Sequence, residues 1–233
     1  MSRNDRETIL GKLRRAVGRT ADDAAARAAV DQRIAAHRRN TVPTRAQLDR
    51  AGIVDLFVEQ ATALDASVTR VADADDVPAA VAAWLQSQNL PSRVRMAPDA
   101  RLDAYPWGRV PLLEIARGKA QADDGVTVTG AFAAVAETGT LMLASGPRHP
   151  TTLNFLPDAH IVVLRADEVV GPYEDGWDRL REAGAMPRTV NFVTGPSRTG
   201  DIEQKLQLGA HGPRRLHIVL VGGGPPANTA ENG

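Results

Sequence analysis

From residue 67 onward, short apolar runs rich in β-branched residues alternate with longer runs rich in Ala and Leu, and this constrains the fold more than any other feature. Continuous apolar strands separated by helices are typical of a mostly parallel sheet that is covered on both faces. The pattern therefore predicts an α/β layered domain. The predicted strands are residues 67–71, 93–96, 160–164, 190–193 and 217–221, and the predicted helices are residues 77–88, 173–183 and 201–208.

The 233 residues divide by composition into three predicted parts. Residues 1–43 are predicted to form a helical arm, because they are rich in Arg and Ala and place apolar residues at helical spacing. Thr44 and Gln47 fit a capping box, which predicts that the α/β domain of residues 44–222 opens with a helix. Residues 223–233 are rich in Gly, Pro and Asn and are predicted to be a disordered tail.

Charge is distributed unevenly along the chain. The first 50 residues contain 12 basic and 6 acidic side chains, whereas the whole chain carries 28 of each. This early excess predicts either a solvated helix face or a docking surface for an acidic partner. A zero net charge gives no global reason to expect nucleic acid as a partner, and 4% aromatic residues are too few for a basic-aromatic nucleic-acid surface.

The chain contains no cysteine, so it forms no disulfide, and we do not expect it to hold an iron–sulfur cluster. Its five histidines lack zinc-type spacing, and no Gly-x-Gly-x-x-Gly motif follows a strand. We therefore expect neither a metal site nor a nicotinamide cofactor of the usual kind. No run of about 18 apolar residues occurs, so we predict a cytoplasmic protein without a membrane span.

Three polar loops beside predicted strands are the candidate sites, because ligands of open α/β sheets bind outside the carboxyl ends of the strands. The first loop contains Glu137, Thr138, Gly139 and Thr140 between two apolar runs. Partial burial would raise the pKa of Glu137 and suit it to nucleophilic or acid–base catalysis. The alternative is a structural glutamate that pairs with an arginine or caps a turn.

The second loop presents Ser145, Arg148 and His149 beside a Gly-Pro turn. Arginine offers a fork of donors that matches a carboxylate or phosphate, and histidine can donate or shuttle a proton near neutral pH. This loop is therefore predicted to hold an anionic group. The alternative is an ordinary turn that leads into a helix.

The third loop follows the predicted strand 190–193, and we expect it to open a helix whose free N–H groups form an anion cradle. Its glycine spacing imitates a P-loop, but Asp201 and Ile202 stand where Lys and a hydroxyl residue are needed. Asp201 and Glu203 can instead neutralise an arginine. A joint site requires the three loops to meet at one edge of the sheet. The candidate ligand-binding residues of this loop are Gly195, Ser197, Arg198, Thr199, Asp201 and Glu203.

Several motifs from about residue 125 to 221 occur together in a family that we recognise. They are Ala-Glu-Thr-Gly-Thr at 136–140, the His149-Pro150 turn, Thr-Gly-Pro-Ser-Arg-Thr at 194–199, Asp-Ile-Glu at 201–203, and Gly-Ala-His-Gly-Pro at 209–213. In this combination the sequence resembles the lactate utilisation protein C family, which is built on the LUD domain. The resemblance adds His211 to the candidate ligand-binding residues.

The resemblance implies a Rossmann-like three-layer fold of the sugar-phosphate isomerase and CoA-transferase type. It also implies a role in oxidising L-lactate to pyruvate beside iron–sulfur oxidoreductase partners. Because this chain has no cysteine, the clusters are expected in those partners and no cofactor is assigned to this chain. An anionic small molecule is expected near Glu137.

Three roles stay open at this point. In the first, the chain is an accessory subunit that binds an anionic ligand or organises the redox partners without doing chemistry. In the second, it is a CoA-transferase-like or sugar-phosphate-type enzyme that uses Glu137. CoA-transferases of the related fold use a glutamate followed by Asn-Gly, whereas Thr138 and Gly139 follow here. In the third, it is a docking or regulatory module whose basic arm binds an acidic partner.

Overall fold

The computed structural model describes residues 3–18, 24–202 and 205–224. The chain divides into two compact units, Met1–Thr41 and Val42–Gly233, and each is described by itself. Among the helices of the described ranges, none combines the length and the apolar character that crossing a bilayer requires.

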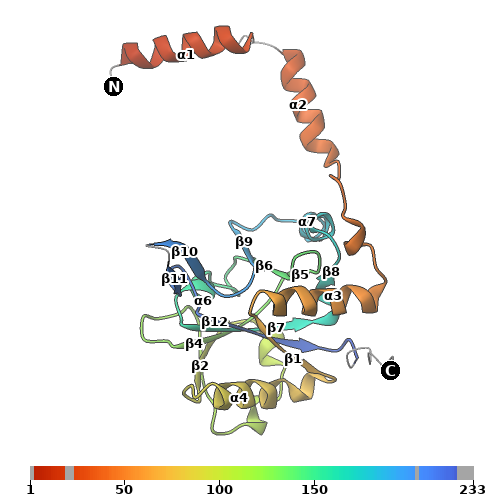
Figure 1. Ribbon diagram of the computed structural model, residues 1–233, viewed down its shortest axis with the longest axis vertical. Helices are drawn as coiled ribbons and strands as arrows, with labels where there is room; N and C mark the ends of the chain where they lie inside the picture. Colours follow the sequence, from red (N-terminus) through yellow and green to blue (C-terminus); the bar gives the residue numbers. More distant parts are fainter. Residues whose placement is uncertain (1–2, 19–23, 203–204, 225–233) are drawn as a thin grey trace. The chain divides into compact units, whose positions relative to one another are not determined.

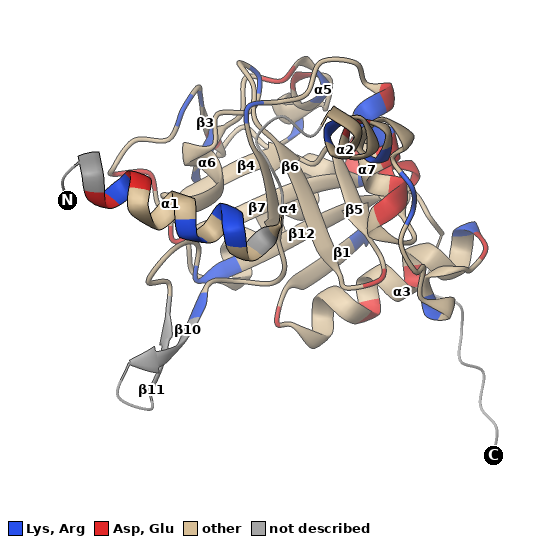
Figure 2. Ribbon diagram, turned by 90° about the horizontal axis from the view of Figure 1, so that it is seen from above, with Lys and Arg blue, Asp and Glu red and all other residues tan. Residues whose placement is uncertain are grey.

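The first unit consists of two helices, α1 (Arg3–Val17) and α2 (Ala24–Ala36). In α1 an acidic residue, Asp5, lies in the first turn and Arg14 and Arg15 lie in the last turn (Figure 2). This arrangement complements the helix dipole, which favours negative charge at the start and positive charge at the end. No residue of α2 is buried, so tertiary packing within this unit contributes little to its stability.

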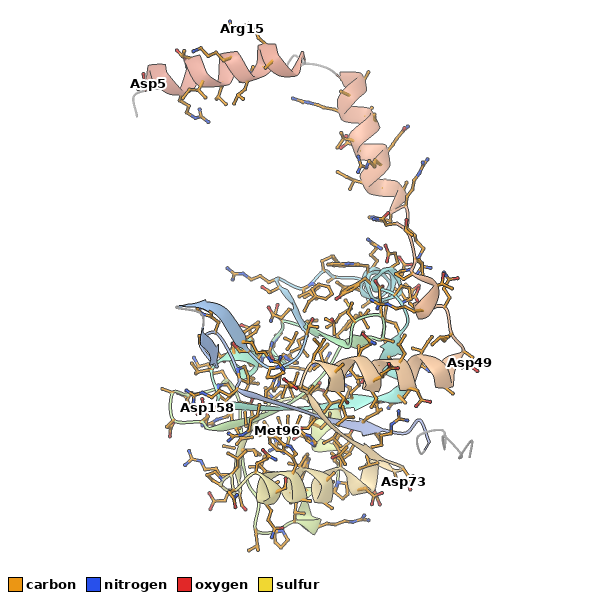
Figure 3. The ribbon with its side chains drawn as sticks, in the orientation of Figure 1. Asp5, Arg15, Asp49, Asp73, Met96 and Asp158 are labelled. Atoms are coloured by element: carbon orange, nitrogen blue, oxygen red, sulfur yellow. The ribbon has the colours of Figure 1, made fainter. Side chains whose placement is uncertain are left out.

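The second unit is built on a six-stranded parallel sheet with the strand order β1-β12-β7-β4-β2-β3 (Figure 1). The carboxyl ends of all six strands therefore lie at one edge of the sheet and the amino ends at the other. Asp73, just after β1, and Asp158, just before β7, mark these two edges (Figure 3). The strands are β1 (Ser67–Val71), β2 (Arg93–Met96), β3 (Glu114–Arg117), β4 (Val126–Gly130), β7 (Ala159–Arg165) and β12 (Arg215–Val221).

Two helices cover the opposite faces of this sheet, α3 (Arg50–Ala63) and α4 (Val77–Ser87) (Figure 1). Successive side chains of a strand point to opposite faces. Accordingly, Ile161 and Val163 of β7 belong to the core beneath α4, whereas Val162 and Leu164 belong to the core beneath α3. The sheet and its two helical coverings thus form three layers.

A second sheet packs on the α3 side of the domain and shares a core with α3. Its strand order is β8-β5-β6-β9, and it mixes parallel and antiparallel pairs. Its strands are β5 (Ala133–Val135), β6 (Thr140–Ala144), β8 (Val169–Val170) and β9 (Val190–Val193). The remaining elements are α5 (Ala100–Asp103), α6 (Thr152–Phe155), α7 (Tyr173–Glu182), the antiparallel hairpin β10 (Arg198–Ile202) and β11 (Lys205–Leu208), and 3-10 turns at Thr44–Ala46, Ala74–Asp76, Trp107–Arg109 and Ala166–Glu168.

The predicted α/β, Rossmann-like architecture is confirmed, and the five predicted strands all form. Strand 190–193, however, joins the second sheet, where it pairs antiparallel with β6. The helix predicted over residues 201–208 is wrong, because this segment forms most of the β10–β11 hairpin. The spacing of its few apolar residues is compatible with a strand as well as with a helix. The hydrogen-bonded pairing of β10 with β11 decides in favour of strands.

The helix predicted from Thr44 begins later than expected. Residues Thr44–Ala46 form a 3-10 turn, and α3 starts at Arg50. The cap is Asp49, whose carboxylate accepts a hydrogen bond from the backbone N–H of Gly52 at 2.8 Å. Of the predicted tail, residues 225–233 lie outside the described residues.

Two buried histidines lie in the neighbouring central strands β7 and β12, on opposite faces of the sheet. His160 shares a hydrogen bond with Thr129 Oγ1 at 2.8 Å, and His217 Nδ1 shares one with Ser67 Oγ at 2.8 Å. The ring of His217 also stacks on Trp84 with a centroid separation of 4.7 Å. Burial lowers the pKa of His160 to about 3 and that of His217 to about 4, so both are neutral near pH 7.

We predict that the α4 face of the sheet is a main source of stability. Leu85→Ala removes a fully buried side chain and should lower the free energy of unfolding by about 2–5 kcal/mol. The matched change Leu112→Ala removes a side chain that is 86% exposed and should change it by less than about 0.5 kcal/mol. Urea unfolding of both variants measures the two values, and similar losses would contradict this assignment of the core.

We also predict that the buried histidines make the fold sensitive to acid. Below pH 6.5 His217 becomes protonated in the unfolded chain, whereas in the folded chain it stays neutral until the pH approaches its folded-state pKa of about 4. The free energy of unfolding therefore falls as the pH falls through this window. Between pH 7 and 4.5, His217→Asn should lose about 2 kcal/mol less stability than the unchanged protein. Urea unfolding at the two pH values tests this, and parallel losses in both proteins would refute it.

Candidate functional site

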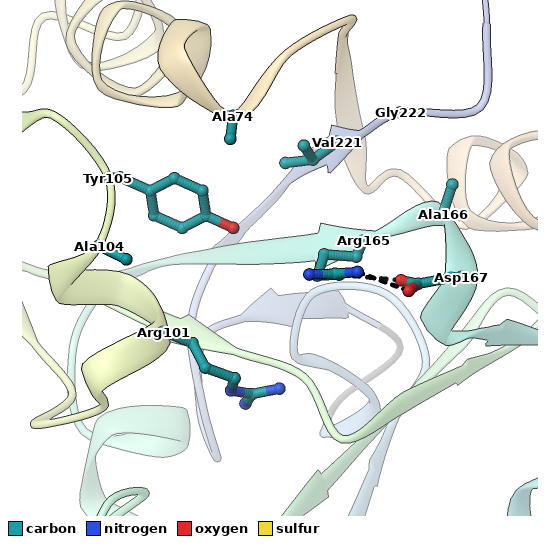
Figure 4. Close-up of a pocket in the computed structure, with 9 residues that line it drawn as sticks. All are labelled: Ala74, Arg101, Ala104, Tyr105, Arg165, Ala166, Asp167, Val221 and Gly222. Carbon is teal, nitrogen blue, oxygen red and sulfur yellow. Dashed lines mark hydrogen bonds and ion pairs between the residues drawn. The ribbon is translucent and has the colours of Figure 1, made fainter.

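A cavity of about 580 Å³ opens at the carboxyl ends of the parallel strands. Arg165 and Val221 are the last residues of the neighbouring strands β7 and β12, and both line the cavity. Arg101 and Tyr105 reach it from the segment that follows β2 (Figure 4). This is the edge at which open α/β sheets bind their ligands. We refer to it as the carboxyl-edge cavity.

Arg101 is fixed at the cavity wall by two acidic side chains. Its Nη1 donates to Glu168 Oε1 at 2.9 Å, and its Nη2 donates to Asp99 Oδ2 at 2.9 Å. Gly130, at the end of β4, leaves room for the guanidinium, because a Cβ there would lie 3.2 Å from Arg101 Nη2. The two acids are almost completely buried, whereas the Arg101 side chain is about half exposed. Arg101 therefore lies against residues at the carboxyl ends of three adjacent strands: Asp99 after β2, Gly130 at the end of β4 and Glu168 after β7.

Arg165 makes a looser pair at the same wall. Its Nε and Nη2 donate to the two carboxylate oxygens of Asp167 at 2.9 and 2.6 Å (Figure 4). Both side chains are about 60% exposed, and exposed ion pairs of this kind contribute about 0–1 kcal/mol. A ligand carboxylate can therefore compete with Asp167 for the guanidinium fork at little cost.

Tyr105 adds a hydroxyl that points into the space between Arg165 and Val221 (Figure 4). Burial raises the pKa of Tyr105, so the phenol keeps its proton at neutral pH. The hydroxyl can thus donate a hydrogen bond to an oxygen of a ligand.

The pKa values of the two acids behind the cavity shift in opposite directions. Burial raises the pKa of Glu168, although Arg101 lies beside it. Burial alone would also raise the pKa of Asp99, but the hydrogen bonds from the side chain and backbone of Arg101 reverse the effect and lower it. Within the described part of the chain, no group of three His, Cys, Asp or Glu side chains is placed to hold a metal ion. The side chains that line the cavity thus offer guanidinium and hydroxyl donors to a ligand.

The first predicted loop lies elsewhere, in the turn between β5 and β6 of the second sheet. Glu137 is half-buried, and its Oε2 accepts a 3.4 Å hydrogen bond from the backbone N–H of Tyr173, the first residue of α7. This geometry matches a carboxylate that caps a helix. Thr138 and Thr140 form a hydroxyl network with the phenol of Tyr173, and Thr140 also bonds to Thr194 at 2.8 Å. The first and third loops do meet at this network.

The conspicuous glycines of the first and third loops are placed against the end of α3. Gly139 has φ +65°, and a Cβ there would lie 2.4 Å from the backbone nitrogen of Ala61. Gly195 has φ +76°, and a Cβ there would lie 2.5 Å from the carbonyl oxygen of Leu64. Only glycine combines this conformation with so close an approach. These two motif positions therefore seat the helix against the second sheet.

The second predicted loop borders a separate hollow of about 360 Å³ that also contains Asp99 and Arg101. His149 is buried and shares a 2.8 Å hydrogen bond with Asn154. Burial lowers the pKa of His149, so the ring is mainly neutral. Arg148 is exposed, and the hydroxyl of Ser145 accepts a hydrogen bond from the backbone N–H of Thr189. This loop thus lies away from Glu137.

The third loop contributes to a cavity at the opposite, amino edge of the sheet, lined among others by Gly195, Ser197, Arg198 and His211. Arg198 donates to the carbonyl oxygen of Leu64 and forms an ion pair with Asp65 at the end of α3. The loop opens β10 and not a helix, so the expected anion cradle of helical N–H groups is wrong. Thr199 and Asp201 lie in β10, where the structure describes the backbone only, and Glu203 lies outside the described residues.

The residues that line the carboxyl-edge cavity were not among the sequence candidates. Arg165 directly follows the predicted strand 160–164, and Arg101 and Tyr105 follow the predicted strand 93–96. Their position after parallel strands is the signal that could have identified them, whereas the three chosen loops adjoin strands of the second sheet.

Comparisons with known proteins match most of the α/β domain. A model of the LUD domain family matches residues 54–221. The lactate utilization protein C of Deinococcus radiodurans is 31% identical over 190 residues, which cover 77% of this chain and 84% of that protein. An uncharacterized protein of Neisseria meningitidis serogroup B is 39% identical over 95 residues, and this match spans only 40% of its length.

A solved structure agrees with the sequence comparisons. The crystal structure of a DUF162 family protein from Deinococcus radiodurans has a TM-score of 0.58 and 29% identity to this chain, and the match covers 75% of this chain and 99% of that one. The resemblance drawn from the loop motifs is confirmed. Because the family model spans most of the chain and the Deinococcus relative most of its own length, this chain belongs to the LUD domain family.

Proposed function

We propose that this chain is a component of an L-lactate utilisation system and that it binds a small organic anion, such as L-lactate or pyruvate, in the carboxyl-edge cavity. The name of the Deinococcus relative, lactate utilization protein C, supports the metabolic role. The chemistry of the cavity supports the ligand class, because guanidinium and phenol donors suit a carboxylate with a neighbouring oxygen.

The pairing of Arg165 carries the ligand proposal. Among the described residues, its guanidinium is paired with Asp167, an exposed neighbour two residues away, and not with a buried acid. A carboxylate ligand would take the place of the Asp167 oxygens and keep both hydrogen bonds. The Tyr105 hydroxyl would donate to the second oxygen of the ligand, the hydroxyl of lactate or the carbonyl of pyruvate. Arg101 is held by two buried acids, so it would contribute mainly a fixed positive charge at the cavity wall.

The proposal includes iron–sulfur partner proteins. Oxidation of lactate to pyruvate releases two electrons, and a chain with no cysteine lacks the usual ligands for a cluster that could accept them. We therefore assign electron transfer to partner chains and assign ligand binding or subunit organisation to this one.

A role for Glu137 is the second candidate. It stays a prediction, supported by the Glu-Thr-Gly sequence and by the partial burial of the carboxylate. The hydrogen bond from the N–H of Tyr173 favours a capping role. In that case Glu137→Gln should lower the free energy of unfolding and leave the affinity for the ligand nearly unchanged.

We predict that Arg165→Gln weakens the binding of L-lactate and pyruvate at least about tenfold, because it removes a charge-assisted, two-pronged contact. Isothermal titration of the purified chain with each acid measures the change. Arg93→Gln is the matched control, because Arg93 is a similarly exposed, paired arginine at the amino end of β2.

Equal affinity in Arg165→Gln and Arg93→Gln would refute the placement of the ligand. If Glu137→Gln alone abolished binding while its unfolding curve stayed unchanged, the second candidate would replace the first.

A further inference from the structure

A second cavity, of about 240 Å³, lies at the amino edge of the parallel sheet, on the side where β10, β11 and α6 gather (Figure 1). His160 and Leu216 are the second residues of β7 and β12, and they pair with each other across the two strands. Strands β7 and β12 therefore separate this amino-edge cavity from the carboxyl-edge cavity. The cavity is lined by, among others, Asn154, His160, Ser197, Arg198, Gly212 and Leu216.

Two buried polar side chains of the wall have an atom without a hydrogen-bond partner among the described residues. Asn154 is 1% exposed, and its Oδ1 is bonded to His149 while its Nδ2 has no partner. His160 is fully buried, and one ring nitrogen is bonded to Thr129 while Nδ1 has no partner. Buried polar groups are nearly always hydrogen-bonded, because leaving one unpaired forfeits its hydration. Both atoms belong to side chains that line the same cavity, which indicates that a bound group supplies the missing hydrogen bonds.

The charge of the lining indicates which group fits. Arg198 is a permanent cation, and among the described residues the lining contains no acidic side chain. The two contacts of Arg198 with α3 both go through Nη2, so neither of them uses Nε or Nη1. Burial lowers the pKa of His160, so this ring adds no positive charge and can exchange a neutral hydrogen bond. An oxygen-bearing anion therefore suits the donors of Arg198 and Asn154.

Part of the remaining lining is apolar, alongside the polar side chains of Thr194, Ser197 and His211. Phe155, Pro213 and Leu216 are among the side chains that enclose the cavity. Its volume is below the roughly 300–1,000 Å³ of sites for drug-sized ligands, so the occupant is compact. A phosphate would leave this apolar surface without a partner, whereas the short chain of an organic acid would cover it.

We propose that the amino-edge cavity binds a short-chain monocarboxylate, whose carboxylate accepts hydrogen bonds from Asn154 and Arg198 and whose alkyl chain packs on Leu216. Ser197 lies beside this position and can contribute its hydroxyl. The site is separate from the carboxyl-edge cavity and does not depend on the function proposed for it. It gives the chain a second small-molecule site on the opposite edge of the same strands.

Two substitutions test the site by different means. Asn154→Asp keeps an oxygen for His149 but replaces the Nδ2 donor with a negative oxygen, so it should repel a carboxylate. Gly212→Val fills the cavity, because a Cβ at Gly212 would lie 3.5 Å from Phe155 and 3.5 Å from Ser197, an ordinary contact distance. Gly212 lies in a loop at the rim, so this variant tests occupancy even if the charge in Asn154→Asp prevents folding.

The probe is butyrate, with its neutral isostere butyramide as the chemical control. Butyrate titrated into ¹⁵N-labelled full chain should shift the side-chain amide signal of Asn154, identified by its loss in Asn154→Asp, in a saturable manner. Affinity from saturation-transfer NMR should fall at least tenfold in Asn154→Asp and in Gly212→Val. It should stay unchanged in Arg93→Gln, because Arg93 lines neither of the two cavities.

Absence of saturable butyrate binding would overturn the proposal, and so would binding that survives both substitutions. Butyramide that binds as tightly as butyrate would overturn the assignment of a carboxylate. Loss of butyrate binding in Arg165→Gln with retention in Gly212→Val would place the acid at the carboxyl edge instead.

Discussion

The structure depends on the burial of β7 and β12 on both faces. Alternate residues of β7 pack beneath α4 and beneath α3, and slipping the strand by one residue would exchange every one of these side chains between the two cores. The pairing of the two strands is thus strongly specified. It also fixes which residues emerge at each end: His160 at the amino edge and Arg165 at the carboxyl edge. With a rise of about 3.3 Å per residue, these two positions lie roughly 16 Å apart.

This arrangement gives one rigid element two chemically different ends. At the carboxyl edge, exposed arginines and a phenol surround an open cavity of about 580 Å³. At the amino edge, neutral buried donors and one arginine line a smaller cavity of about 240 Å³. Strands β7 and β12 contribute residues to both walls, so their register fixes that part of each cavity, while connecting segments supply the rest.

The sequence predicted the parts of the fold that are governed by continuous apolar runs. Strand β4 was missed because its sequence alternates Val with Thr, and threonine is a polar residue type that does not by itself indicate a buried strand. In the structure these threonines are buried because the hydroxyl of Thr127 bonds to the carbonyl oxygen of Leu153 and that of Thr129 bonds to His160. The motif loops were harder to interpret. Gly139 and Gly195 are distinctive in sequence because they allow close packing against α3, whereas the arginines at the strand ends stand alone without a motif. The rule that ligands bind at the carboxyl ends of parallel strands is hard to apply from sequence alone, because only strand pairing reveals which strands share an edge.

The most direct test of the account is growth on L-lactate as the sole carbon source, in cells whose own copy of this gene has been deleted. We expect deletion to abolish growth, and the unchanged chain or Arg93→Gln to restore it. Arg165→Gln should fail to restore growth although it folds and accumulates normally. Full growth with Arg165→Gln would contradict the claim that the carboxyl-edge cavity is the working site, and full growth without the chain would contradict its role in lactate utilisation.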